Sequence, residues 1–459
     1  MPRARLAAFA LVLVAGCNAN SVTPSLRTSG ASQSALTRRN ATSPIEHVVV
    51  IIQENRTFND FFATFPGADG STTGVVLPNP ACKIKTKSTI KLKESGLITL
   101  YKGSPHDLIH AYEGYNKARD GGSMDGFDLI IFGDHSTPEC TFPYQYTKPS
   151  DIRPYWQMAK QYVLAEHMFP TQGSSSFTAH QDLIAGDTVI SPNEALIDLP
   201  SAPPWGCDAP KGTRTSLITK DNVFQPAQGP YPCLTYPTLR DRLDAKGVTW
   251  RYYVPPECCS TNGKLLDAFD AIKAVREGSE WSDGHIVSQK KIFSDLTGHL
   301  QEVSWVIPDE NDSDHPGTSS DTGPSWVASV VNAIGESSYW NSTAIVILWD
   351  DWGGLYDNDA PPQKGYGGLG FRVPAIIVSP YAKAGTISTT QYEFGSVLKY
   401  IEENFGLKSL KRTDSRATSI ADCFNYSQKP ILFQPIKAKY SRAHFLHAKP
   451  SYLPVDTDM

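Results

Sequence analysis

Several features are scarce or missing in this 459-residue sequence, and each excludes a class of protein. The chain carries 42 basic and 47 acidic residues, a net charge of −5, so it lacks the basic excess with which nucleic-acid-binding proteins neutralise phosphates. No internal repeat is present, which excludes solenoids and propellers. After the N-terminal segment, no apolar run approaches the ~20 residues that a membrane-spanning helix needs. Because the basic excess is missing, nucleic acid is not an expected partner.

The N-terminus has the pattern of an export signal. Arg3 and Arg5 precede a short apolar run over residues 6–14, which is too short to span a bilayer. The run ends in Leu-Val-Ala-Gly before Cys17, a pattern that resembles a bacterial lipobox, in which the signal peptide is cut before an acylated cysteine. An ordinary signal peptide with a chance cysteine remains the alternative.

These patterns predict a signal peptide over residues 1–16 and a lipidated Cys17. Residues 17–43 are rich in Ser, Thr and Asn, and we expect them to form a flexible tether to a folded domain over 44–459. The protein is therefore expected to be exported, either as a lipoprotein of the bacterial cell envelope, held at the membrane by its lipid anchor, or as a secreted protein.

Export places the remaining cysteines in a compartment where disulfides persist. Eight cysteines are present and seven follow Cys17, so at least one stays unpaired or pairs between chains. Cys207 and Cys233 flank a segment rich in Pro and Gly and are the expected pair. None of the cysteines has the spacing of a zinc site.

Short apolar runs separated by helical patterns predict a doubly wound α/β sheet. The expected buried, parallel strands cover residues 45–52, 163–169, 343–349 and 373–378. Amphipathic helices are expected over 326–334 and 397–405. Residues from about 185 to 300 are expected to form a loop-rich insertion or subdomain with an edge strand at 248–254.

Two acidic motifs follow directly after predicted strands. Glu54-Asn55-Arg56 follows the first strand and Asp350-Asp351 follows the third, so both are expected at the carboxyl edge of the sheet, where α/β folds bind ligands. Adjacent carboxylates raise each other's pKa unless a cation neutralises them. Their oxygens favour Ca²⁺ or Mg²⁺, with manganese or iron as alternatives. A loop-capping role for the aspartates is the simpler explanation.

A run of three serines, Ser174 to Ser176, follows the strand at 163–169 and opens a predicted helix. A hydroxyl at a helix N-terminus is a candidate nucleophile, because that end favours both an alkoxide and a bound phosphate. Capping of the helix is the alternative role.

Three histidines near these motifs, His106, His110 and His315, are candidates for contact with a phosphoryl group. An imidazole can hydrogen-bond the equatorial oxygens or protonate a leaving group. Taken singly, each histidine fits an ordinary loop position equally well.

The order of all these motifs resembles a known family. The same order includes Asp107, Met124-Asp125-Gly126-Phe127, Ser304-Trp305 and Pro361-Pro362. The chain resembles, over residues 44–425, the bacterial phosphoesterase family of phospholipases C and acid phosphatases, whose fold is related to that of alkaline phosphatase. The resemblance implies an alkaline-phosphatase-like α/β/α sandwich with a mostly parallel central sheet, and a catalytic site built from a metal and a hydroxyl nucleophile.

The resemblance also implies roles for individual residues. The family's metal ligands fall on Glu54, Asn55, Asp350, Asp351 and Ser176, its nucleophile on Ser176, and its phosphate-contacting histidines on His110 and His315. Arg56 would either contact phosphate or orient the ligands beside it.

The sequence departs from the family pattern at two places. The serine run has an extra residue and lacks a proline found in many relatives, so Ser175 is a rival nucleophile. Asn358 stands where many relatives have a histidine.

The expected function is metal-dependent hydrolysis of phosphoric esters through a phosphoserine intermediate, as in a phospholipase C or acid phosphatase. The substrate would be a phospholipid or a small phosphomonoester. One alternative is a phosphomonoesterase with little phospholipase activity. Another is a catalytically silent, surface-binding lipoprotein.

Overall fold

A computed structural model describes residues 43–98, 107–133, 137–257 and 262–452. Cys17 and the predicted signal peptide and tether lie outside these ranges, as do His106, Cys258 and Cys259. Within them, no helix is both long and apolar enough to cross a membrane.

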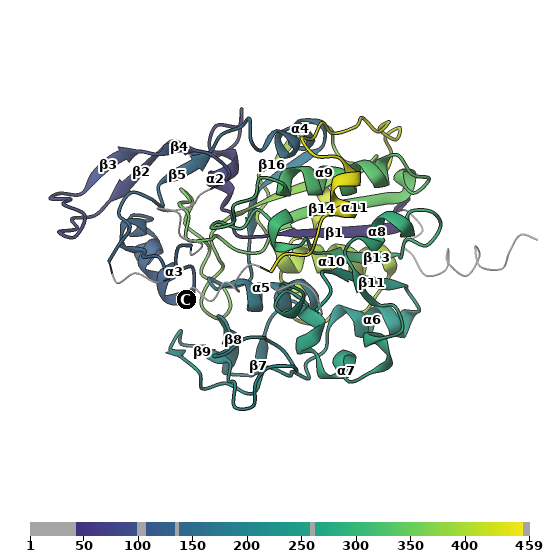
Figure 1. The fold of residues 1–459 in the computed structure, drawn as a ribbon, viewed down its shortest axis with the longest axis horizontal. Helices are drawn as coiled ribbons and strands as arrows, with labels where there is room; N and C mark the ends of the chain where they lie inside the picture. Colours follow the sequence, from purple (N-terminus) through teal and green to yellow (C-terminus); the bar gives the residue numbers. More distant parts are fainter. Residues whose placement is uncertain (1–42, 99–106, 134–136, 258–261, 453–459) are drawn as a thin grey trace, which may run out of the picture. The chain divides into compact units, whose positions relative to one another are not determined.

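A nine-stranded, mostly parallel sheet forms the centre of the fold (Figure 1). Its strand order is β12-β11-β13-β1-β14-β15-β6-β16, and β17 pairs with β6 beside β16. The strands are β1 (His47–Gln53), β6 (Val163–Phe169), β11 (Trp250–Val254), β12 (Ile286–Ser288), β13 (Val303–Val306), β14 (Thr343–Trp349), β15 (Val373–Val378), β16 (Thr386–Ser388) and β17 (Tyr392–Glu393). Every residue of β1 and β14 is buried, as expected for strands covered on both faces.

Helices cover both faces of this sheet, with α4 and α9 on one side and α5 and α10 on the other (Figure 1). The helices are α2 (Phe58–Phe62), α3 (Tyr112–Arg119), α4 (Arg153–Gln161), α5 (Ser176–Ala185), α6 (Leu239–Lys246), α7 (Lys273–Arg276), α8 (Lys291–Asp295), α9 (Gly323–Gly335), α10 (Phe394–Phe405) and α11 (Arg442–His447). Local sequence explains several ends: α9 has a proline in its first turn, and α10 ends at Gly406, whose φ is 61°. The predicted three-layer α/β arrangement and both predicted helices are confirmed.

The structure contains each predicted strand, but one of them runs antiparallel to its neighbours and another does not lie at the edge of the sheet. Strand β15 covers the predicted residues 373–378 but runs antiparallel to both of its neighbours, β14 and β6. An apolar run shows that a strand is buried without giving its direction, so this part of the prediction was wrong. We expected the strand at 248–254 to lie at an edge of the sheet. The corresponding strand, β11, lies between β13 and the three-residue β12 instead. Part of the 185–300 range thus belongs to the central sheet.

Smaller sheets flank the central one. The strands β7 (Val189–Ser191), β8 (Glu194–Ile197), β9 (Ser216–Thr219) and β10 (Phe224–Gln225) form a four-stranded sheet, while β2 (Thr73–Val76) pairs with β3 (Ser88–Lys91) and β4 (Lys93–Ser95) with β5 (Gln145–Thr147). The predicted disulfide between Cys207 and Cys233 is present, and a second joins Cys82 to Cys140. Cys423 is buried with a free thiol.

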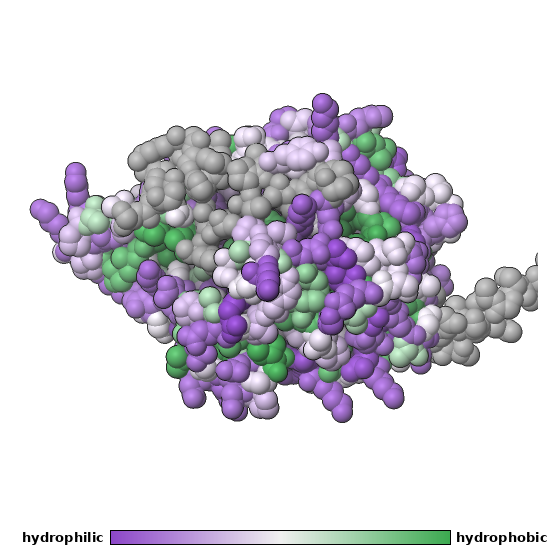
Figure 2. Space-filling model, turned by 60° about the horizontal axis from the view of Figure 1, so that its bottom comes forward, coloured by the Kyte–Doolittle hydropathy of each residue, from purple (hydrophilic) through white to green (hydrophobic). Residues whose placement is uncertain are grey.

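The surface turned forward in Figure 2 is largely hydrophilic, with small apolar patches between polar regions. Large apolar side chains with exposed surface include Ile190, Val223 and Leu432. Scattered exposed apolar residues of this kind are ordinary on a folded domain.

Candidate active site

Three loops meet at one edge of the central sheet. Strands β1, β14 and β6 all point the same way, because β1 is parallel to β14 and β15 is antiparallel to both β14 and β6. Their carboxyl ends therefore lie at the same edge, where open α/β sheets bind ligands. Glu54 follows β1, Asp350 follows β14, and the serine run follows β6. The predicted convergence of these motifs is present.

The acidic side chains of these loops are buried. Glu54, Asp350 and Asp351 are each at most 1% exposed. The backbone N–H of Asn55 donates to Asp350 Oδ1 over 3.0 Å, which ties the first loop to the second. Burial, and then the neighbouring Asp350, raise the pKa of Glu54 and raise that of Asp351 to about 7. Such a cluster calls for protons or for a cation.

His180, which the sequence analysis did not single out, completes this cluster. Its Nε2 lies 2.9 Å from Glu54 Oε1 and 3.9 Å from Asp350 Oδ2. Ligand atoms of Glu54, His180 and Asp350 all lie within 4.8 Å of one another. Burial lowers the pKa of His180, which favours the neutral imidazole that binds metals. His180 stands four residues after Ser176 on α5, a spacing that places both on one face of the helix.

The donor set fits a divalent cation. Asp350 Oδ2 is buried and has no hydrogen-bond partner among the described residues, and the same holds for His180 Nδ1. A buried carboxylate oxygen without a partner is costly unless something positive satisfies it. Two carboxylates and an imidazole are oxygen and nitrogen ligands of the type that divalent metals take.

The three serines differ in their contacts. Ser176 Oγ lies 3.1 Å from Asp351 Oδ2 and 3.5 Å from Glu54 Oε2, at the first residue of α5. Ser174 Oγ instead lies 2.7 Å from Thr178 Oγ1 and donates to Asp198 over 3.2 Å. Ser175 Oγ is buried without a hydrogen-bond partner in the described chain. Of the three hydroxyls, that of Ser176 contacts the acidic cluster.

The two predicted histidines approach the cluster through Asn55. With its amide oriented to satisfy its neighbours, the Asn55 oxygen accepts from His110 Nε2 over 3.1 Å and from His315 Nε2 over 3.2 Å. Its nitrogen donates to Asp350 Oδ1 and Glu54 Oε2. Asn55 has a φ of 53°, in the left-handed region that asparagine tolerates better than most residues. Gly353 packs against Asn55: a Cβ added to Gly353 would stand 2.4 Å from the Asn55 carbonyl oxygen.

Arg56 is buried and its donors go to other parts of the protein. Its Nε donates to the Asp314 carbonyl over 2.7 Å, Nη2 donates to the Leu97 carbonyl over 2.9 Å, and Nη1 pairs with Asp60. Because Asp314 precedes His315, this arrangement fits the orienting role better than contact with phosphate. Asn358, in place of the family's histidine, accepts a hydrogen bond from Arg372.

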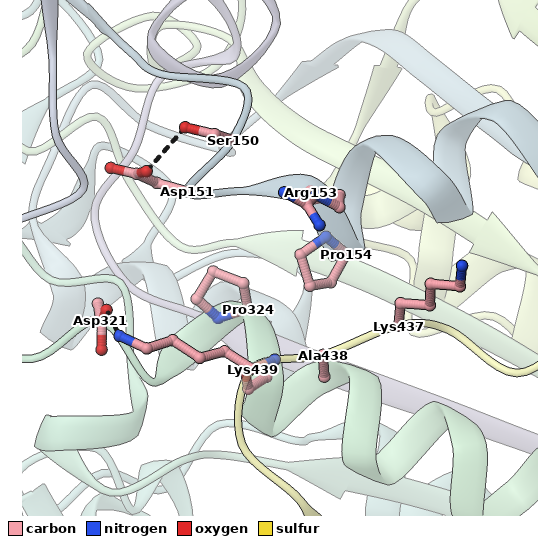
Figure 3. A pocket seen from close by; sticks show the side chains of 10 residues that line it. Ser150, Asp151, Arg153, Pro154, Asp321, Pro324, Lys437, Ala438 and Lys439 are labelled. Atoms are coloured by element: carbon pink, nitrogen blue, oxygen red, sulfur yellow. Dashed lines mark hydrogen bonds and ion pairs between the residues drawn. The ribbon is translucent and has the colours of Figure 1, made fainter.

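A narrow cavity opens at this cluster. Its lining combines polar site residues with apolar side chains: Glu54, His110, Ser176, Leu199, Trp205, Leu265, Leu266, Glu310 and His315. A larger cavity of about 400 Å³ lies between α4, α9 and residues 437–439 (Figure 3). It is lined by none of the predicted site residues, and Lys439 pairs there with Asp321.

Comparisons with known proteins place most of the chain in one family. A model described as "Phosphoesterase family" matches residues 45–408. The chain is 25% identical over 421 residues to a non-hemolytic phospholipase C of Pseudomonas aeruginosa, covering 79% of this chain and 54% of that protein. It is 22% identical over 440 residues to phospholipase C A of Mycobacterium tuberculosis, covering 85% and 79%.

The chain thus spans about half the length of the Pseudomonas protein. Among solved structures, a protein in the alkaline phosphatase superfamily from Vibrio parahaemolyticus aligns with a TM-score of 0.34 and 10% identity. That alignment covers 59% of this chain and 65% of the other.

Proposed function

Because the chain belongs to the phosphoesterase family, we propose that it hydrolyses phosphoric esters and that Ser176 is its nucleophile. The observation that carries this proposal is the position of Ser176 Oγ, 3.1 Å from Asp351 and 3.5 Å from Glu54, at the edge of a buried cluster whose ligands suit a metal. A serine that served only as a helix cap would not need two buried acidic neighbours.

Glu54, His180 and Asp350 are the residues that would hold the metal, with Asp351 and Asn55 beside them. A bound divalent cation would neutralise the carboxylates, lower the pKa of the serine hydroxyl and stabilise charge on the phosphoryl oxygens. Carboxylates alone favour Ca²⁺ or Mg²⁺, but imidazole ligands suit iron better. His180 therefore shifts the expectation, among Ca, Mg, Mn and Fe, toward iron.

The side chains of the protein would carry out a two-step transfer. Ser176 Oγ attacks phosphorus in line and passes its proton to Asp351, while the bond from phosphorus to the substrate alcohol breaks. His110 and His315 hold the phosphoryl oxygens, and one of them protonates the departing alcohol. Water then attacks the phosphorus of the phosphoserine, and the bond from phosphorus to Ser176 Oγ breaks. Asp351 returns the proton to Oγ, which restores the hydroxyl.

The names of the curated relatives favour a phospholipid substrate over a small phosphomonoester. A phospholipase C cleaves the bond between phosphate and the diacylglycerol, which leaves a phosphorylated headgroup. Export and lipid anchoring at Cys17 stay predictions, and both would bring the site to the compartment in which membrane lipids or extracellular phosphate esters are met.

Chelation tests the metal dependence of this activity. We expect the protein to hydrolyse a chromogenic phosphodiester. Excess chelator should abolish that activity, because it removes the cation that the three buried ligands share, and added Mn²⁺ or Fe²⁺ should restore it. Rates on a chromogenic monoester under the same conditions separate a diesterase from a monoesterase. Unchanged hydrolysis in a preparation shown by elemental analysis to be metal-free would contradict the proposed metal.

A further inference from the structure

The cavity beside Ser176 is lined by side chains of two chemical kinds. The polar ones are Glu54, His110, Ser176, Glu310 and His315, which are the groups suited to a metal and a phosphoryl group. The apolar ones are Leu199, Trp205, Leu265 and Leu266, each at most 7% exposed, and these four residues are here named the apolar wall. The cavity holds only about 20 Å³. Side chains have to move apart to admit a phosphoryl group, and whatever is attached to that group then contacts the apolar wall.

Trp205 is the one residue of the apolar wall whose side chain carries a hydrogen-bond donor. It is 3% exposed, and its Nε1 is buried with no hydrogen-bond partner among the described residues. Buried indole N–H groups usually have a partner, because an unmet donor costs free energy. The ring packs edge-on against Phe177, the residue after Ser176, with the centroids 6.1 Å apart. A substrate oxygen bound in the cavity would supply the missing acceptor.

The segment that carries Trp205 is held firmly from behind. Cys207 forms a disulfide with Cys233, and its backbone N–H donates to the Asp270 carbonyl over 3.0 Å. Gly206 packs closely on Asp270: a Cβ there would meet Asp270 Oδ2 at 2.1 Å. The side-chain movement that admits a substrate therefore leaves the backbone of this segment in place, which limits the conformational entropy lost on binding.

We propose that Leu199, Trp205, Leu265 and Leu266 form the subsite for the alcohol part of the substrate, and that Trp205 Nε1–H donates to an oxygen of that part. This inference rests on the proposed function. The substrate class that fits is a phosphoric diester whose departing alcohol is apolar but carries ester carbonyls, as a diacylglycerol does. A polar alcohol such as glycerol has little apolar surface to bury against the apolar wall, so it gains less binding free energy there.

Two diesters that differ only in the departing alcohol test this subsite. Dibutyroylphosphatidylcholine releases a diacylglycerol, glycerophosphocholine releases glycerol, and both yield phosphocholine, so one assay measures kcat/KM for both. We expect the wild type to prefer the first ester. Trp205→Phe, which keeps the ring and removes the N–H, should lower kcat/KM for that ester about tenfold and change it less than twofold for the second. Leu266→Ala should act in the same direction through lost apolar contact.

Trp281→Phe is the matched control, since Trp281 lies outside the cavity and stacks on Arg276; it should leave both rates unchanged. Thermal melting checks that each variant is folded. A folded Trp205→Phe that loses activity equally on both esters, or on neither, would overturn the subsite while leaving the proposed function intact. A wild type that cleaves both esters equally well would also overturn it. Only a metal-loaded wild type that hydrolyses no phosphoric ester would contradict the proposed function itself.

Discussion

Ser176 and His180 lie one turn apart on α5, so a single helix presents a nucleophile and an imidazole to the same acidic cluster. The sequence alone marked Glu54, Asp350 and Ser176, because each follows a strand whose carboxyl end is predictable. It did not mark His180, because a histidine inside a helix has many ordinary roles. The spacing of four residues from a candidate nucleophile was the signal that was available. Arg56 shows the converse, since only the structure shows where its donors go.

His180→Ala should reduce both metal content and activity while leaving the fold intact. Loss of a residue that merely supports a ligand typically costs ~10–100-fold in metal affinity, and we expect a larger loss for His180. Elemental analysis and the hydrolysis rate measure the two effects. His299→Ala is the control, because His299 is exposed and belongs to none of the residue groups that could hold a metal ion in the described part of the chain. Full metal occupancy in folded His180→Ala would exclude His180 as a ligand.

The strands and helices were predictable where their pattern is long and uniform. Strands β1, β6 and β14 and helices α9 and α10 follow from uninterrupted apolar runs or an apolar face. The direction of β15 was not predictable, since a buried strand reads alike in parallel and antiparallel sheets. The three-residue β12 is too short to give a periodic signal, and missing it made β11 look like an edge strand.

Helix α10 also carries a buried acid whose ionisation sets a pH dependence of stability. Burial, and then nearby Asp414, raise the pKa of Glu402 to about 8 in the folded protein. The unfolded chain loses this proton near pH 4.5, so stability falls as the pH rises from about 4.5 to about 8 and is then level. Glu402→Gln removes this dependence and should stabilise the protein by ~1–3 kcal/mol at pH 9, with little effect at pH 4.5.

Chemical denaturation at the two pH values measures this difference. The amide keeps an oxygen to accept from the Leu410 N–H, as the carboxylate does over 2.9 Å. Glu403→Gln is the control, because Glu403 is the exposed neighbour on the same helix and should show no such gain. A Glu402→Gln variant that is less stable than the wild type at pH 9 would show that the folded protein tolerates the charge.

At the scale of the whole molecule, one sheet edge gathers motifs more than 290 positions apart in the chain, as in the hydrogen bond between Asn55 and Asp350. The family and its three-layer fold could be anticipated because those motifs keep their order along the chain. The apolar wall with Trp205 could not be anticipated, because Leu199, Trp205 and Leu265 lie on loops whose packing no periodic pattern encodes. Family membership thus accounts for the hydrolysis of phosphoric esters, and the loops around the cavity are where we expect substrate preference to be determined.

Peptide mass spectrometry after acid quenching tests whether Ser176 attacks phosphorus. The metal-loaded protein is mixed with a chromogenic diester, quenched within the first turnovers and digested. We expect a phosphoryl group on Ser176 and none on Ser174 or Ser175. We also expect that Ser176→Ala folds and binds metal but is slower by several orders of magnitude. A phosphoryl group on Ser175, or none at all together with an active Ser176→Ala, would contradict attack by Ser176.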